Sequence, residues 1–155
     1  MKILIVSDTH GKNIIKLIQK IKNVDYIIHL GDNYKDVFIL EAELNKPTHF
    51  VKGNCDFGPG VDTRKIISIA GKRIFITHGH LYKVKQGLDD LKANAFRNNV
   101  DIALFGHTHD PQIFVERGIT FLNPGSPAYP VRGEYPTIGI IEIKEGQVRP
   151  YIIRI

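Results

Sequence analysis

The stretch "KILIVSDTHG", residues 2–11, joins an uninterrupted aliphatic run to a polar loop. The run from Ile3 to Val6 is typical of a strand buried on both faces, because a half-exposed strand alternates apolar and polar residues. Asp8 and His10 follow directly, one residue apart. A buried strand that ends in such a pair predicts an α/β fold with a site at the carboxyl end of its sheet.

Apolar periodicity predicts alternating strands and helices over the first fifty residues. Further strands are expected at residues 25–30 and 48–52, with a helix before each of them. The helical positions are Ile14, Leu17, Ile18 and Ile21 in the first helix, and Val37, Leu40 and Leu44 in the second. This alternation predicts parallel pairing, with helices covering the faces of the sheet.

The pattern changes after Thr63. Residues 63–79 predict a hairpin that turns at Gly71, and residues 101–106 predict another buried strand. Two more hairpins are predicted with turns at Arg117-Gly118 and Glu145-Gly146, and a third helix is predicted from the spacing of Val84, Leu88, Leu91 and Ala95. We therefore expect a single α/β domain, residues 1–155, with mixed sheets in the middle and helices outside.

The composition limits the class of protein, its compartment and its partners. The chain has 155 residues, of which 43% are hydrophobic and 24% charged, as in soluble globular proteins. One cysteine, Cys55, rules out an internal disulfide and favours a reducing compartment, which we expect to be the cytoplasm. No run has the length of a membrane span, so no membrane partner is expected. The formal net charge of +5 is scattered, and either ordinary surface charge or steering of an anion accounts for it.

Polar residues gather wherever a predicted strand ends. They are Asp8 and His10, Gly31 and Asp32, Asn54 to Asp56, His78 and His80, and His107 and His109. Because ligands bind beyond the carboxyl ends of strands in open α/β sheets, these five loops are expected to meet. Carboxylate, amide and imidazole groups suit Mn²⁺, Fe, Zn²⁺, Co²⁺ or Ni²⁺. Two such ions with two carboxylates remain cationic, and paired ions promote displacement at phosphorus.

The ordered set D-x-H, G-D, G-N-x-D, H-G-H and G-H-T-H resembles the calcineurin-like metallophosphoesterases. The short length, "GNCD" and "NPGS" at residues 123–126 resemble the small prokaryotic phosphodiesterase branch of that family. The resemblance implies a four-layer α/β/β/α sandwich with two mixed β-sheets. It also implies two divalent ions, with Mn²⁺ or Ni²⁺ expected first. Hydrolysis of a small phosphodiester by a hydroxide that bridges the ions is the expected reaction, and a homodimer or homotetramer is a possible assembly.

The resemblance assigns roles residue by residue. Asp8, His10 and His109 would bind the first ion, Asp32 would bridge both ions, and Asn54, His78 and His107 would complete the second. Asp32, Asn54 and Cys55 form the expected catalytic set, and Asn54, His80 and Ser126 would bind substrate. Cys55 departs from the family pattern, in which many members have a histidine that assists the leaving group. A thiol is a poorer proton donor here, so good leaving groups are favoured unless Cys55 is only a small buried filler.

Other residues have a structural alternative. His29 lies within a predicted strand and is expected to be a hydrogen-bonded core residue. Asp56 either caps its loop or supports the site, and His80 either lines the metal site or is structural. Asn123 and Ser126 either approach the phosphate or only form a turn.

Two other functions are possible for such a chain. One is a non-catalytic metal-binding scaffold, as in relatives such as the retromer trafficking subunit that have lost ligands. The complete set of ligand types argues against it. The other is a nuclease, but the sequence lacks a basic cluster with interleaved aromatic residues, so nucleic acid is not an expected partner.

Overall fold

The computed structural model describes residues 1–12, 21, 23–131 and 135–155. The helix predicted from Ile14, Leu17 and Ile18 lies outside these residues. The helices described are α2 (Asp36–Leu44), α3 (Asp89–Arg97) and a short 3-10 helix (His80–Tyr82). The strands are β1 (Lys2–Val6), β2 (Tyr26–His29), β3 (Thr48–Phe50), β4 (Arg64–Ile69), β5 (Lys72–Thr77), β6 (Ile102–Leu104), β7 (Gln112–Glu116), β8 (Ile119–Asn123), β9 (Thr137–Lys144) and β10 (Gln147–Arg154).

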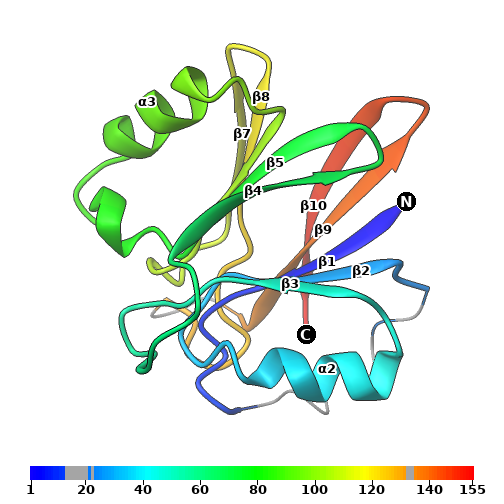
Figure 1. Ribbon diagram of the computed structural model, residues 1–155, viewed down its shortest axis with the longest axis vertical. Coiled ribbons are helices and arrows are strands. Elements are labelled where there is room, and N and C mark those ends of the chain that lie inside the picture. Colours follow the sequence, from blue (N-terminus) through cyan, green and yellow to red (C-terminus); the bar gives the residue numbers. More distant parts are fainter. Residues whose placement is uncertain (13–20, 22, 132–134) are drawn as a thin grey trace.

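The strands form two mixed sheets of five strands each (Figure 1). In the first, ordered β10-β9-β1-β2-β3, strands β1, β2 and β3 are parallel and the β9–β10 hairpin is added antiparallel. In the second, ordered β4-β5-β6-β8-β7, strands β5, β6 and β8 are parallel, with β4 and β7 antiparallel at the edges. The three predicted hairpins are confirmed.

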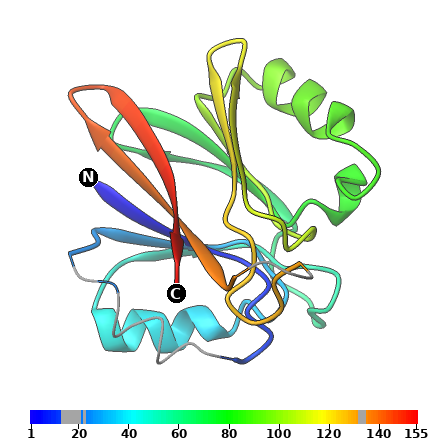
Figure 2. The same cartoon turned by 180° about the vertical axis from the view of Figure 1, so that it is seen from behind.

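Alternating residues of β1 show how the layers are stacked. Ile3 and Ile5 face the other sheet and share a core with Ile76 of β5, whereas Leu4 and Val6 share a core with Leu40 of α2. A third core lies under α3, where Leu91 and Ala95 pack with Phe105 and Phe121. Figure 2 shows α2 and α3 on opposite outer sides of the paired sheets. The predicted α/β sandwich, with mixed sheets inside and helices outside, is confirmed.

The predicted third helix begins later than expected. Val84 and Leu88 precede α3, because the chain leaves the 3-10 helix at Lys83 with a left-handed φ of 50°. Both side chains still pack against the core under α3. Their spacing in the sequence therefore reflects burial in this core, although neither residue is part of the helix. Asp89 and Asp90 then place two carboxylates at the helix N-terminus, where the helix dipole favours them. Within the described residues, no helix combines the length and apolarity needed to cross a membrane.

Candidate metal centre

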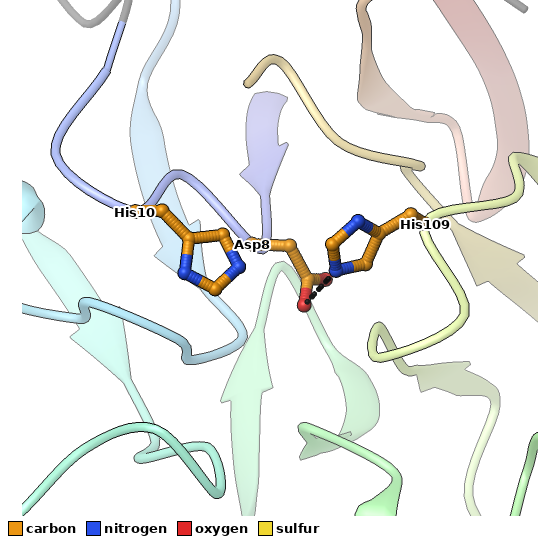
Figure 3. Close-up of side chains that lie close together, drawn as sticks. All are labelled: Asp8, His10 and His109. Carbon is orange, nitrogen blue, oxygen red and sulfur yellow. Dashed lines mark ion pairs between the residues drawn. The ribbon is translucent and has the colours of Figure 1, made fainter. Parts of the chain in front are cut away.

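The predicted site residues follow the carboxyl ends of the parallel strands, three in each sheet. Asp8 and His10 follow β1, Asp32 follows β2, Asn54 and Cys55 follow β3, His78 and His80 follow β5, His107 and His109 follow β6, and Ser126 follows β8. Backbone hydrogen bonds join the loops within each sheet: Asp8 N donates to Gly31 O (2.9 Å), and Gly106 N donates to His78 O (3.0 Å). Figure 3 shows the imidazoles of His10 and His109 on either side of Asp8, although they come from different sheets.

Asp8 lies at the centre of this arrangement and is completely buried. Its Oδ1 lies 3.1 Å from Nε2 of His78 and 3.1 Å from Nε2 of His109. Its Oδ2 accepts hydrogen bonds from the Ser7 hydroxyl (2.6 Å) and the His107 backbone N–H (3.0 Å). Burial alone would raise the pKa of Asp8, but its hydrogen bonds with His109, His78 and Ser7 hold it well below the ordinary value. The group is therefore a carboxylate, the form that binds metal ions.

Asp32 provides a second buried carboxylate, 3% exposed. Its Oδ2 lies 3.6 Å from Nε2 of His78 and 3.8 Å from Nε2 of His10. Its Oδ1 accepts a hydrogen bond from the Cys55 backbone N–H (2.9 Å). His78 thus stands between the two carboxylates, and Asp32 connects it to His10.

Glycine is required where the backbone passes these carboxylates. A Cβ at Gly106 would collide with the Ser7 hydroxyl and the Asp8 carboxylate, and one at Gly53 would collide with Asp32. The glycines of "GHTH" and "GNCD" therefore let neighbouring loops approach the carboxylates closely.

Five of the site residues share an uncommon backbone conformation. Positive φ angles occur at Asp8 (55°), His10 (47°), Asp32 (56°), His107 (70°) and His109 (60°). A side chain in this left-handed region costs roughly 1 kcal/mol, so the surrounding contacts must impose it. Such clustering is typical of functional sites, where strain persists because the scaffold over-determines the geometry.

Asp56 supplies part of that scaffold. Its Oδ2 accepts the backbone N–H groups of Asp32 (2.9 Å) and Gly53 (2.8 Å), and its Oδ1 accepts those of Asn33 (2.8 Å) and Tyr34 (3.2 Å). One carboxylate therefore ties the loop after β2 to the loop after β3. Asp56 both caps its loop and supports the site.

Ser126, a predicted substrate-binding residue, has a different position. It is completely buried, and its hydroxyl donates to the Asp8 carbonyl (2.8 Å). The same oxygen accepts the backbone N–H groups of Ala128 (3.1 Å) and Tyr129 (2.8 Å). Ser126 is therefore a buried support of Asp8 in this structure, and its direct contact with a substrate stays a prediction. Asn123 forms the predicted turn, since its Oδ1 accepts the Gly125 N–H (2.9 Å).

Hydrogen bonds orient the imidazoles. Nδ1 of His109 lies 2.6 Å from the Tyr129 carbonyl oxygen, which only accepts, so Nδ1 carries a hydrogen and Nε2 faces Asp8. The hydrogen bond with Asp8 raises the pKa of His109 in spite of burial. Nε2 of His109 and Oδ1 of Asp8, 3.1 Å apart, therefore face each other as two possible ligand atoms for one ion.

His80 and His107 lie beside His78, at ring-centroid distances of 5.2 and 4.9 Å. Nδ1 of His78 is 3.1 Å from Nδ1 of His80. Burial lowers the pKa of His107 to about 4 and also lowers that of His80. Both rings are thus neutral near pH 7, the form in which histidine binds metals.

Within the described residues, three groups of ligand atoms could each hold a metal ion, with the atoms of a group within 4.8 Å of one another. Two of them, here called the two triads, offer only oxygen and nitrogen: Asp8, His10 and His109, and Asp8, Asp32 and His78. The third group is His10, Asp32 and Cys55. Carboxylate oxygen and imidazole nitrogen fit divalent first-row ions. Because the two triads share Asp8, the donor set fits a pair of neighbouring ions.

Sequence comparison decides the family. Residues 1–146 match the model of the calcineurin-like phosphoesterase superfamily domain. The chain belongs to this family. It is similar to the probable metallophosphoesterase YsnB of Bacillus subtilis, with 35% identity over 129 residues, covering 81% of this chain and 75% of the relative.

Solved structures agree with this assignment. This calcineurin-like phosphoesterase is similar to a structure described as a novel archaeal phosphodiesterase, with 28% identity, a TM-score of 0.78 and coverage of 99% of this chain and 100% of the other. It shares its fold with Vps29 of Entamoeba histolytica, with a TM-score of 0.81, 24% identity and coverage of 100% and 99%.

Asn54 and Cys55 lie at the exposed rim of this phosphoesterase site. The Asn54 amide donates to Cys55 Sγ (3.5 Å), and among the described residues His107 contributes no atom to the two triads. Cys55 is exposed, so the alternative of a buried filler is wrong. Partial burial and the nearby Asp32 raise the pKa of its thiol to about 11. Sγ nevertheless lies within 4.8 Å of ligand atoms of His10 and Asp32, at the edge of the centre.

Sequence reasoning missed several residues of the phosphoesterase site. Ser7 and Thr9 flank Asp8, and their position at the end of a buried strand was an available signal. The Tyr129 carbonyl could not be found in this way, because a backbone group leaves no mark on residue type.

Proposed function

We propose that this chain hydrolyses phosphodiester bonds of small molecules with the help of two divalent metal ions. The observation that carries the proposal is the placement of His78 between the buried carboxylates of Asp8 and Asp32, 3.1 and 3.6 Å from its Nε2. His109 and His10 extend the same cluster on its two sides. Relatives named as phosphodiesterases support this reaction class.

The site residues would hold two metal ions. When bound, the ions supply Lewis-acid stabilisation of a phosphate and activation of water. Asp8, His10 and His109 would hold one ion. Asp32 would be shared by both ions, and Asn54, His78 and His107 would complete the site of the second ion.

The orientation of His78 assigns a part to His80. If Nε2 of His78 binds an ion, Nδ1 must carry the hydrogen and donate it to Nδ1 of His80, 3.1 Å away. His80 then holds its own hydrogen on Nε2 and fixes the ring of His78. Asn54 does not orient a histidine ring in this way, and its exposed amide would bind a phosphate oxygen.

The resemblance to the family implies Mn²⁺ or Ni²⁺, and the ligand chemistry also accepts Fe, Zn²⁺ or Co²⁺. The triads offer oxygen and nitrogen donors, which these ions accept. The raised pKa of Cys55, about 11, keeps its thiol neutral and so withholds a soft thiolate. An exposed free cysteine is also suited to the reducing cytoplasm.

The neighbourhood of the site favours a small substrate with an apolar ester group. Phe57 is 87% exposed and lies three residues after Asn54, and Leu81, 54% exposed, follows His80. Tyr129, 45% exposed, stands edge-on to His10 with ring centroids 5.3 Å apart. Exposed aromatic and aliphatic groups beside a charged centre would bind such a group by burial of apolar surface.

The test is hydrolysis of bis(4-nitrophenyl) phosphate by metal-stripped protein while Mn²⁺, or Ni²⁺ in its place, is titrated in. We expect turnover that rises with the metal and is lost in Asp32→Asn. Asp62→Asn, an exposed position whose side chain makes no hydrogen bond or ion pair among those described, is the control and retains turnover. Stoichiometric metal binding without turnover of any phosphoester would contradict the proposal and support a scaffold. Salt-sensitive cleavage of oligonucleotides would support a nuclease.

A further inference from the structure

We infer that His29 is a positioning residue that acts through Thr9 to hold the metal-binding loops after β1 and β2 at a fixed spacing. The inference rests on the metal site of the proposed function, though not on catalysis. His29 is the last residue of β2 and is completely buried, as is Thr9. His29 contributes no atom to the two ligand triads.

The hydrogens of this chain of contacts can be assigned one by one. The Gly31 N–H donates to Nδ1 of His29 (3.1 Å), so Nδ1 is unprotonated and the neutral ring carries its hydrogen on Nε2. Nε2 lies 2.9 Å from the Thr9 hydroxyl and donates to it. The hydroxyl in turn donates to Oδ2 of Asp36 (2.6 Å), at the start of α2. Each donor has one acceptor, so the chain runs in a single direction.

This series of hydrogen bonds connects residues that are adjacent to the metal-site residues. Thr9 lies between Asp8 and His10, and Gly31 directly precedes Asp32. Asp36 also accepts the N–H of Gly11, which follows His10 (2.9 Å). The imidazole therefore bridges the loop that carries Asp8 and His10 to the loop that carries Asp32.

The bridge formed by His29 would hold residues of these loops in left-handed conformations. Asp8, His10 and Asp32 have φ angles of 55°, 47° and 56°, which the chain would not adopt without imposed contacts. Loss of the Thr9 hydroxyl would leave His29 Nε2 without its acceptor at a buried position, and it would remove one of the two donors to Asp36 Oδ2, leaving only the Gly11 N–H. The loops would then relax, and the ligands would lose their common spacing.

The experiment compares Thr9→Val, which removes the hydroxyl at constant shape, with Thr9→Ser, which keeps it. Mn²⁺ affinity is measured by isothermal titration calorimetry, and unfolding of the metal-free proteins is measured in parallel. We expect Thr9→Val to lose roughly ten- to a hundredfold in Mn²⁺ affinity, as for other partners of metal ligands, and Thr9→Ser to restore it. Thr120→Val, the same change in β8 of the other sheet, keeps its affinity and controls for the exchange itself.

The outcomes separate the possibilities. Equal Mn²⁺ affinities in folded Thr9→Val and Thr9→Ser would overturn the inference, even if Thr9→Val were less stable. If Thr9→Val does not fold, Asp36→Ala removes the acceptor at the end of the chain, and unchanged affinity there overturns it. Nitrogen-15 NMR of the wild-type protein must show His29 protonated on Nε2 alone. A wild type that binds no Mn²⁺ would instead refute the metal site of the proposed function.

Discussion

The carboxylate of Asp8 lies 3.1 Å from Nε2 of His109, although Asp8 follows a strand of one sheet and His109 follows a strand of the other. This contact joins the two halves of the sandwich at the centre of the site. Packing between the sheets, where Ile5 of β1 shares a core with Leu104 of β6, determines how far apart the two loops lie. Assembly of the metal centre therefore depends on correct docking of the sheets.

Removal of the Asp8 charge should strongly weaken metal binding. Asp8→Asn keeps the size of the side chain but takes away the charge shared by both triads. We expect Mn²⁺ affinity to fall by more than about a hundredfold, since even partners outside the ligand set cost roughly ten- to a hundredfold. Equilibrium dialysis measures the effect, with the exposed Asp90→Asn as control. Retention of two ions by Asp8→Asn would show that Asp8 is not a shared ligand.

Asp32 and Cys55 should differ sharply in kcat/KM. Cys55→Ala keeps the backbone N–H that binds Asp32 Oδ1, and it removes a thiol whose pKa of about 11 leaves it neutral at pH 7 to 8. We expect a change of no more than a few-fold for Cys55→Ala and a loss of roughly a thousandfold or more for Asp32→Asn. Steady-state hydrolysis of bis(4-nitrophenyl) phosphate measures both. Equal losses would mean that Asp32 is no metal ligand or that Cys55 is catalytic.

Ser126→Ala should act on stability and metal binding. The change leaves two backbone N–H groups and the Asp8 carbonyl without the buried hydroxyl, at a cost of about 2 to 3 kcal/mol in the free energy of unfolding. Ser68→Ala, at an exposed position of β4, should be nearly neutral. Urea unfolding and the split between kcat and KM test this role. A rise in KM with unchanged kcat and stability would instead support Ser126 as a substrate-binding residue.

Asp56→Asn should loosen the loops after β2 and β3. An amide offers one acceptor oxygen in place of two, so it cannot serve four backbone N–H groups, and we expect about 3 kcal/mol of destabilisation. Asp101→Asn is the matched control, because Asp101 accepts a single backbone N–H, that of Arg73, and pairs only with the surface amine of Lys72 (3.7 Å), so its loss should cost about 1 kcal/mol. Thermal unfolding compares the two. Similar costs would mean that the four bonds of Asp56 add little.

His29 should make the metal-free protein less stable in weak acid. Burial lowers its pKa to about 4 against the opposing charge of Asp36, whereas an unfolded chain has a pKa near 6.5. Between those values the unfolded state binds more protons, so the free energy of unfolding falls as pH falls. His29→Gln should reduce this slope by nearly one proton, about 1.4 kcal/mol per pH unit. The free energy of unfolding of both proteins, measured by urea unfolding from pH 5 to 6, tests this difference in slope. An unchanged slope would mean that His29 titrates normally in the folded protein.

The local sequence determined most of the secondary structure. The aliphatic run of β1 and the turns at Arg117-Gly118 and Glu145-Gly146 were predictable because burial and positive φ constrain residue type directly. The loops that carry the site were predictable for a related reason: parallel strands of a sheet end at one edge. Val84 and Leu88 were misplaced because helical spacing also arises in a buried loop.

Only the tertiary structure decided what each polar residue contacts. Ser126 supports Asp8 from within the core, and the partner of His109 is the carbonyl of Tyr129. Backbone groups are the same in every residue, so such partners have no signature in the sequence. The sequence by itself determined which donors are present and near which strand ends they lie. The packing of two sheets determined their distances and hydrogen-bond directions, because these depend on contacts between segments far apart in the chain.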